Sequence, residues 1–319
     1  LIYTAGKRSK LVRLAESNRS LQTLAFEDLL RVLRYQLRSA YANLVYDLQS
    51  HRLLQNEAIQ QASLVRAMQV QLQQGGVSPY EMTRLEAELQ GLQTDMNNLK
   101  FQIADEQATL RTYLGQRENV FILPTEPPVT LTILPLERVA LDSALANRPD
   151  VNLSLAQVDN AQRSLDLEKA RRTPDLTAGF LFDKYGNAFS NYTGLNVAMD
   201  LPFFNRNQGN VKVAQFRMEG ARKSVEGQQV TAQNEVLNAY QKLNEVYQLN
   251  ASLPADYRAS LQNISREATQ NYNRRVINLL DYLDKIRMYR QAQLRLIDLQ
   301  NNLFQSQQYL NFVTNTAFF

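Results

Sequence analysis

Two carboxylates on one helix face are the residues of this chain best placed to act on a charged ligand. Asp281 and Asp284 lie three residues apart, so an α-helix brings them one turn apart on the same face. Repeated around an axis, such a pair would attract cations; the plainer interpretation is two solvated charges near a helix end. Glu81 holds the equivalent place in an earlier part of the chain, and Arg274 and Arg275 precede the pair.

The other residues that could do chemistry argue against catalysis. His51 is the single histidine and cysteine is absent, so a metal site with the usual number of nitrogen and sulfur ligands cannot form. Its neighbours Leu48 and Leu53 indicate a place on a helix seam or surface. The sequence contains no Ser-His-Asp arrangement and no phosphate-binding glycine loop. It therefore predicts a protein that is not an enzyme and carries no cofactor.

The composition is typical of long helices with narrow apolar seams. Hydrophobic residues make up 44% of the chain, yet tryptophan is absent and only 11 of 319 residues are glycine. The net charge of +4 comes from 35 basic and 31 acidic residues, without a block of like charge. Nucleic acid is therefore not an expected partner.

The chain contains an internal repeat. Residues 4–44 resemble residues 203–243, and further on the segment around Glu81 meets the segment around Asp281. Identical residues recur in the two copies as Val12 and Val211, Ala15 and Ala214, Ala40 and Ala239, Tyr41 and Tyr240, and Leu44 and Leu243. This repeat predicts a duplicated architecture, with a long helix, a short break and a second long helix in each copy.

Proline and glycine mark the ends of these helices. Residues 7–73 contain neither, and their apolar residues recur at spacings of three and four. Gly75-Gly76 predicts a break, and Ser78-Pro79 predicts the start of the return helix, which ends near residue 115. In the second copy we expect helices over 209–272 and 279–315, with a kink or local break at Pro254. Such hairpins cannot bury their apolar seams alone.

The segment between the copies has a different character. Prolines bracket residues 129–133, which we expect to form a short edge strand, and helices are expected over 139–146 and 149–172. The hydrophobic period then changes to two over 176–183 and 194–201, which predicts a β-hairpin. One face of this hairpin is apolar and the other small or polar. This pattern suits a strand pair in a transmembrane β-barrel, or a soluble hairpin packed on helices. On the membrane interpretation, the residues facing lipid are Phe180, Phe182, Leu195, Val197 and Met199.

Three motifs between the repeated hairpins carry a resemblance to a known family. They are residues 146–151 (Ala-Asn-Arg-Pro-Asp-Val), residues 173–176 (Thr-Pro-Asp-Leu) and residues 200–209 (Asp-Leu-Pro-Phe-Phe-Asn-Arg-Asn-Gln-Gly). In this order and spacing the chain resembles outer-membrane efflux proteins of the TolC type, most closely the heavy-metal subgroup similar to CzcC and CusC. The resemblance implies a mainly α fold, in which duplicated helical hairpins form an α-barrel and a β-hairpin contributes to an outer-membrane β-barrel of a homotrimer.

The resemblance also implies a division of the chain and a location for it. The first hairpin would span residues 1–116, entered from a missing N-terminal strand pair. A small mixed equatorial segment with a connecting helix would span 117–175, the barrel hairpin 176–202 and the second helical hairpin 203–319. The protein would lie in the bacterial outer membrane, in contact with its lipid, and extend into the periplasm.

The breaks between paired helices correspond to the periplasmic entrance of the family. The resemblance implies a gate with an acidic pair, a basic latch residue and an aromatic partner, here Asp281, Asp284, Glu81, Arg274, Arg275 and Tyr272. It also implies that the tips contact a periplasmic adaptor protein, through Gly75, Gly76, Val77, Ser78, Val276 and Ile277.

The expected function is a passive exit duct of a tripartite efflux system, built with the adaptor and an inner-membrane pump. Its expected cargo is heavy-metal cations. A duct of the same fold for drugs or for type I secretion is an alternative. A structural coiled-coil scaffold is a more remote one, and the two strands argue against it because a helical scaffold has no need of them.

Overall fold

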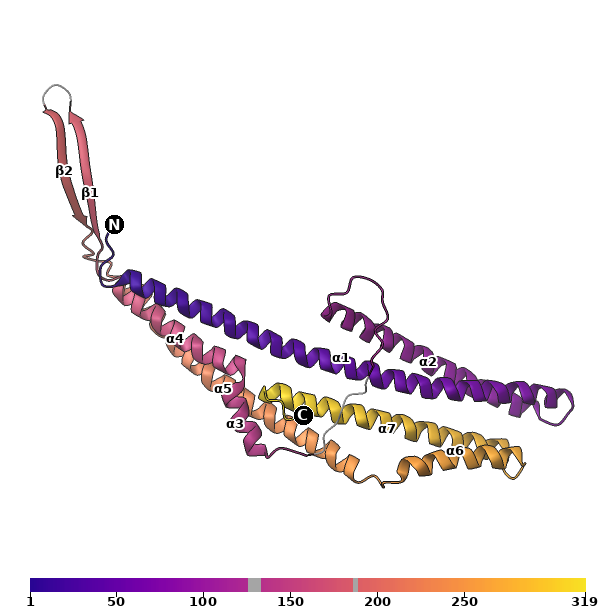
Figure 1. The fold of residues 1–319 in the computed structure, drawn as a ribbon. Coiled ribbons are helices and arrows are strands. Elements are labelled where there is room, and N and C mark those ends of the chain that lie inside the picture. Colours follow the sequence, from indigo (N-terminus) through magenta and orange to yellow (C-terminus); the bar gives the residue numbers. More distant parts are fainter. Residues whose placement is uncertain (126–132, 186–188) are drawn as a thin grey trace. The chain divides into compact units, whose positions relative to one another are not determined.

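The computed structural model describes residues 1–125, 133–185 and 189–319; for residues 183–185 and 189–192 only the backbone is described. The elements in chain order are α1 (Lys7–Gln73), α2 (Pro79–Tyr113), α3 (Glu137–Asn147), α4 (Pro149–Ala170), β1 (Leu176–Tyr185), β2 (Phe189–Met199), α5 (Gln208–Ala251), α6 (Tyr257–Asn273) and α7 (Leu279–Thr314) (Figure 1). The chain divides into two compact units. Unit 1 comprises Leu1–Arg31 and Arg138–Val236, and unit 2 comprises Val32–Glu137 and Leu237–Phe319.

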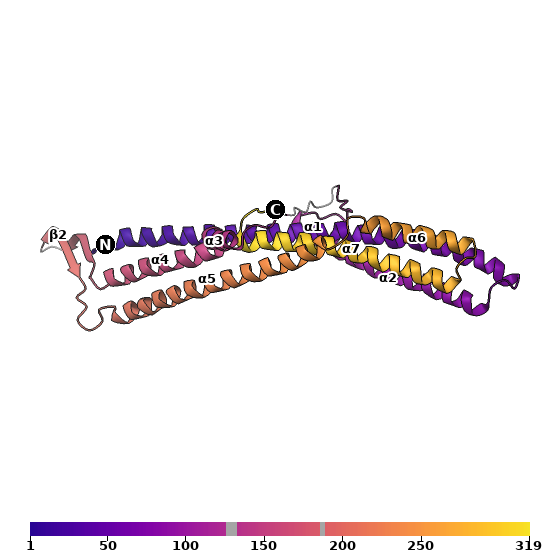
Figure 2. The same cartoon turned by 90° about the horizontal axis from the view of Figure 1, so that it is seen from below.

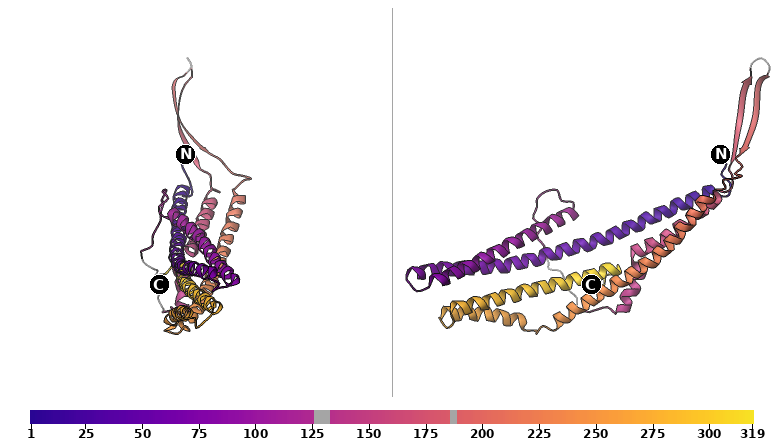
Figure 3. Two further views of the ribbon diagram at one scale, coloured as in Figure 1. Left: turned by 90° about the vertical axis from the view of Figure 1, so that its right-hand side faces the viewer. Right: turned by 180° about the vertical axis from the view of Figure 1, so that it is seen from behind.

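Unit 1 places three helical segments side by side, namely the start of α1, all of α4 and the first part of α5 (Figures 2 and 3). The amide of Asn160 on α4 donates hydrogen bonds to Ser17 and Asn18 on α1, each at 2.7 Å. On its other side, α4 contacts α5 through Asp150, which accepts a hydrogen bond from Gln228 at 2.9 Å. Polar side chains thus fix the register of these helices, in addition to the apolar seam expected from the sequence.

The two strands form an antiparallel hairpin, as predicted. Phe180 lies opposite Leu195, and Ala178 lies opposite Val197. Because directly opposed residues of an antiparallel pair point to the same face, the two apolar sets predicted from the sequence form one continuous face. The predicted bounds of the second strand, 194–201, were wrong. It covers Phe189–Met199, because aromatic and β-branched residues before 194 favour extended backbone and Pro202 limits pairing after it.

The N-terminal residues are tied to the beginning of β1 within unit 1. Ile2 and Leu176 exchange two backbone hydrogen bonds, at 2.6 and 3.1 Å. The Nζ atom of Lys7 lies 2.7 Å from the Asp175 carboxylate, which also accepts a hydrogen bond from the Thr4 amide. The hydrogen bond from Lys7, followed by that from Thr4, lowers the pKa of Asp175. These contacts hold the last residues before β1 against the start of α1.

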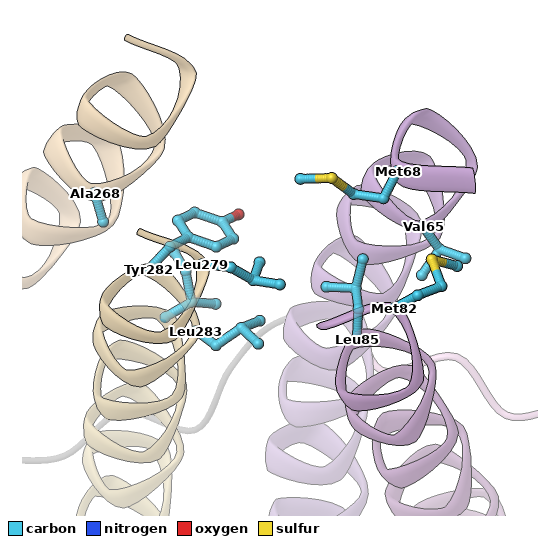
Figure 4. Packing of buried hydrophobic residues seen from close by; sticks show 9 residues of the cluster. Val65, Met68, Met82, Leu85, Ala268, Leu279, Tyr282 and Leu283 are labelled. Carbon is cyan, nitrogen blue, oxygen red and sulfur yellow. The ribbon is translucent and has the colours of Figure 1, made fainter. Parts of the chain in front are cut away.

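Unit 2 contains both helical hairpin tips. α2 runs back along the C-terminal part of α1, and α6 packs on α7 (Figure 1). Apolar side chains from all four helices meet in one core cluster: Val65 and Met68 from α1, Met82 and Leu85 from α2, Ala268 from α6, and Leu279, Tyr282, Leu283 and Ile286 from α7 (Figure 4). Near the tips, the apolar side chains of the two hairpins therefore form one shared core.

The helix ends agree with the proline and glycine pattern. α1 covers Lys7–Gln73, and the second copy is interrupted between Ala251 and Tyr257 around Pro254, as predicted. The helices predicted over 139–146 and 149–172 are confirmed as α3 and α4. The edge strand expected over 129–133 lies almost wholly outside the described residues. No described helix has both the length and the apolar character to cross a membrane.

Candidate functional site

The two hairpin tips close with the same backbone hydrogen bonds. After α1, the amide of Gly75 donates to the Leu72 carbonyl at 3.1 Å, and the amide of Gly76 donates to the Gln71 carbonyl at 2.8 Å. After α6, Arg275 donates to Tyr272 at 2.9 Å and Val276 donates to Asn271 at 2.8 Å. Both pairs are Schellman motifs, which require a left-handed residue directly after the helix cap. That residue is Gly75 (φ +73°) in the first tip and Arg275 (φ +57°) in the second.

The return helices also begin alike. The Ser78 hydroxyl accepts a hydrogen bond from the amide of Glu81 at 3.2 Å, and the Glu81 carboxylate accepts one from the amide of Ser78 at 3.0 Å. This reciprocal pair is a capping box. In the second tip, Asn278 accepts a hydrogen bond from the amide of Asp281 at 2.9 Å. Glu81 therefore has a structural role, and its bonds from Ser78 lower its pKa.

The structure brings three of the predicted gate residues together. Glu81, Tyr272 and Arg275 line one pocket of about 490 Å³ in unit 2, together with Val77 and Asn278. Asp281 and Asp284 do not line this pocket, and both are exposed on α7. Arg274 is exposed as well. Among the described residues, neither arginine forms an ion pair with either aspartate, so the latch between them stays a prediction.

Tyr272 is half-buried and stacked on a residue that sequence reasoning missed. The ring centroids of Tyr272 and Tyr282 lie 4.7 Å apart with an interplanar angle of 24°. The Tyr272 hydroxyl lies 3.7 Å from the sulfur of Met68. Burial raises the pKa of both phenols. Tyr282 lies between the two aspartates in the sequence. Its position among the apolar residues of α7 could have indicated that it is buried next to Tyr272.

The residues predicted to contact an adaptor differ in exposure. The Val276 side chain is 68% exposed, and Gly75, Gly76 and Ser78 are also exposed. Val77 and Ile277 instead pack against the core cluster of unit 2. Val276 is therefore the predicted contact that offers most apolar surface at the tip.

The apolar face of the β-hairpin is uncovered within the described part of the chain. Leu195 is 84% exposed, Phe180 71% and Val197 69%. Phe182 and Met199 belong to the same exposed face. Large aromatic and aliphatic side chains gathered on one face of a strand pair need an apolar environment or a partner.

A buried charge cluster in unit 1 explains the Arg148-Pro149-Asp150 motif. Arg148 is only 2% exposed and binds Asp150 through two nitrogens, at 2.6 and 3.0 Å. A third nitrogen lies 2.6 Å from Glu235 on α5, and Arg31 on α1 lies 3.4 Å from Asp150. Burial raises the pKa of Asp150, but the bonds from Arg148 outweigh it, so the pKa is lowered. The motif thus joins α1, α4 and α5.

A second charge cluster, in unit 2, was also missed from the sequence. Arg290 on α7 lies 3.3 Å from Glu57 on α1 and 2.8 Å from Glu88 on α2. Arg287 binds the other oxygen of Glu88 at 2.5 Å. These residues are far apart in the chain, so no local sequence pattern predicts that they form ion pairs. Among the described residues, no group of acidic, histidine or cysteine side chains is arranged to hold a metal ion.

Comparison with known proteins decides the family. A model of the outer membrane efflux protein family matches residues 140–316, which is more than half of the chain. The chain belongs to the outer membrane efflux protein family. Membership locates it in the bacterial outer membrane, from which it extends into the periplasm. This family is one of channels rather than enzymes, and its members form trimeric channels that work with an adaptor and a pump.

Individual relatives include a metal resistance protein and a pyoverdine export protein. The cobalt-zinc-cadmium resistance protein CzcC of Cupriavidus metallidurans is 23% identical over 96% of this chain and 73% of its own length. The pyoverdine export outer membrane protein OpmQ of Pseudomonas putida is 29% identical over 69% of this chain and 41% of its own length. A crystal structure of CusC has the same fold, with a TM-score of 0.76, 19% identity and coverage of 97% of this chain and 74% of that one.

Proposed function

We propose that three copies of this chain form a passive exit duct for heavy-metal cations, joined through its hairpin tips to a periplasmic adaptor and an inner-membrane pump. The observation that carries the proposal is the similarity to a cobalt-zinc-cadmium resistance protein along 96% of the chain. The chain would supply a path and no energy of its own.

Exposed apolar side chains on the helices support the trimer. Leu29 and Leu33 of α1, Phe101 of α2 and Val230 of α5 are each at least 36% exposed. Neighbouring copies would cover such seams, and a closed ring leaves none at an open edge. Mass measurement of the natural full-length protein in mild detergent should give three chains. A stable monomer at micromolar concentration would contradict the proposal.

We propose that the apolar face of the β-hairpin faces outer-membrane lipid. Val197 and Asn196 are adjacent in β2 and point to opposite faces, so they form a matched pair. Val197→Arg should raise the free energy of membrane insertion by roughly 2–4 kcal/mol near the bilayer midplane, whereas Asn196→Arg should be tolerated. Equal assembly of the two variants, measured by outer-membrane fractionation, would argue against this orientation.

We propose that the acidic tip residues attract the cargo. Asp281 and Asp284 are exposed on α7, and three copies would place their charges around one axis. Arg274, Arg275, Tyr272 and Glu81 would regulate access to this constriction. The exposed tip residues, with Val276 as the main apolar contact, would receive the adaptor.

A cellular export assay tests the cargo. Deleting the gene should lower tolerance to cobalt, zinc and cadmium and raise the cell-associated amount of these metals, and the wild-type gene should restore both. Tolerance to organic drugs serves as the control. Unchanged metal tolerance combined with lost drug tolerance would contradict metal export.

The similarity to a pyoverdine export protein favours a second candidate, a duct for organic cargo. That relative is matched over less than half of its own length, so it weighs less than the metal-resistance protein. The same assay separates the two, because the organic duct predicts that drug or siderophore export fails while metal tolerance is kept.

A further inference from the structure

The charge cluster of unit 2 contains one carboxylate that is poorly matched to its surroundings. The side chains of Glu57, Glu88 and Arg290 are 9%, 16% and 11% exposed. Glu88 binds a different arginine through each of its oxygens. Glu57 has one contact of 3.3 Å through Oε1, while its buried Oε2 has no hydrogen-bond partner among the described residues. Burial without such a partner disfavours the ionised form.

The groups around Glu57 offer it little further compensation. On its own helix, Gln61 lies one turn further on and is 3% exposed; its Nε2 also lacks a partner among the described residues and makes no hydrogen bond to Glu57. On α7, burial raises the pKa values of the Tyr282 and Tyr289 phenols, and the Glu57 charge adds to the rise. On α2, the Glu88 carboxylate repels it. Arg290 is therefore its main source of stabilisation, and Arg290 is shared.

The two carboxylates consequently respond to protons differently. Burial raises the pKa of Glu57 to about 7, Arg290 lowers it in part, and Glu88 adds to the rise. Burial also raises the pKa of Glu88, but its bonds from Arg287 and Arg290 outweigh this, and the pKa is lowered. Near neutral pH, Glu57 changes its charge while Glu88 stays ionised.

We propose that Glu57 is a proton-operated latch in unit 2, at which protonation tightens the packing of α1 against α2 and α7 and ionisation loosens it. When Glu57 is protonated, Arg290 pairs with Glu88 alone, and no uncompensated charge is buried. Ionised Glu57 leaves an anionic oxygen without a donor, and the helices relieve this by opening to water. If the chain works as the duct proposed above, the latch would make the mobility of its tips depend on periplasmic pH.

The direction of the pH effect follows from linkage. A carboxyl whose pKa is higher in the folded than in the unfolded chain binds its proton more tightly when folded. Its contribution to stability is complete below the unfolded pKa and is lost as pH rises through the folded pKa. With a folded pKa of about 7, the equilibrium constant for opening should rise roughly tenfold between pH 6 and pH 8.

Hydrogen exchange of the full-length protein at pH 6 and pH 8, corrected for intrinsic exchange, tests the latch without any transport assay. Peptides spanning residues 52–64 and 284–293 should show the tenfold rise, and a peptide spanning 149–165 in unit 1 provides the internal control. Glu57→Gln should reduce the rise to less than twofold. The matched control Glu86→Gln, an exposed glutamate on α2, should leave it unchanged.

A second variant and a second titrating group complete the test. Glu88→Gln should weaken protection at both pH values, because it removes the partner of Arg287 and Arg290 whatever the state of Glu57. Asp47, whose pKa burial raises to about 6, also titrates on α1, so the difference between wild type and Glu57→Gln isolates Glu57. The latch is overturned if wild-type exchange is the same at both pH values or if Glu57→Gln keeps the full rise. If Glu57→Gln does not fold, Asp47→Asn takes its place: the latch predicts that this variant keeps the tenfold rise, and loss of the rise would overturn the latch.

Discussion

The two hairpin tips form the same Schellman turn from different residues. Gly75 and Arg275 occupy the same left-handed position, and Ser78 and Asn278 occupy the same N-cap. The later helix ends agree too, since the left-handed residue after α2 is Gly115 and the one after α7 is Asn315. Duplication therefore preserved the hydrogen-bond pattern and let the residue types diverge. Where the second copy has arginine or asparagine in place of glycine, it carries backbone strain that the first avoids.

The two copies differ most in the continuity of their first helix, which is unbroken in the first copy and divided in the second. α1 passes Leu54 without interruption, and this side chain is 4% exposed. In the second copy the helix is interrupted in the corresponding region, where Pro254 is exposed between α5 and α6. The first copy thus keeps a continuous helix where it buries a leucine, and the second copy breaks at an exposed proline.

Exchanging these two residues should have the largest effect. Leu54→Pro removes a helical hydrogen bond and a buried side chain, so we expect a loss of at least about 3 kcal/mol in the free energy of unfolding. Pro254→Leu should change it by less than about 1 kcal/mol. Denaturant unfolding followed by circular dichroism measures both. Similar stabilities for the two variants would show that the copies do not differ as described.

Exchanging the left-handed residues should have a smaller effect of opposite signs. Gly75→Arg introduces a side chain at positive φ and should cost about 1–2 kcal/mol. Arg275→Gly relieves the same strain and should stabilise by up to about 1 kcal/mol, because the freedom of glycine in the unfolded chain offsets part of the gain. The midpoints of thermal unfolding should shift in opposite directions. A loss of stability in both variants would mean that the Arg275 side chain makes contacts that outweigh its strain.

The helix caps should give the smallest difference. Ser78→Ala removes a complete capping box and should cost about 1 kcal/mol, whereas Asn278→Ala removes one hydrogen bond and should cost about 0.5 kcal/mol. Glu81→Gln is the control, because glutamine also serves in a capping box. Thermal unfolding of the three variants ranks their losses of stability. If Glu81→Gln costs as much as Ser78→Ala, the charge of Glu81 matters beyond the cap.

Local sequence patterns predicted the helix ends and breaks, because these features depend on residues that are neighbours in the chain. The bounds of α1, the start of α2 at Ser78-Pro79 and the break at Pro254 follow from propensity and capping. The start of β2 was missed because its aromatic residues were read as loop. The clusters around Arg148 and Glu57 join residues more than eighty positions apart, and the stacking of Tyr272 on Tyr282 depends on how α6 meets α7. Such contacts come from tertiary packing, which a single sequence does not display.

The central claim is that this chain forms a channel whose tip carboxylates attract cations, and ion selectivity in planar bilayers tests it most directly. The full-length protein should conduct cations in preference to anions, and the double variant Asp281→Asn, Asp284→Asn should lose much of this preference and of its block by multivalent cations, while still assembling as a trimer. Raising the salt concentration should weaken the effect, because these charges are exposed to solvent. Arg274→Ser or Arg275→Ser should raise the conductance if either residue acts as a latch. Wild-type selectivity and block in the double Asn variant would contradict the account, since the aspartates would then be ordinary solvated charges at a helix end.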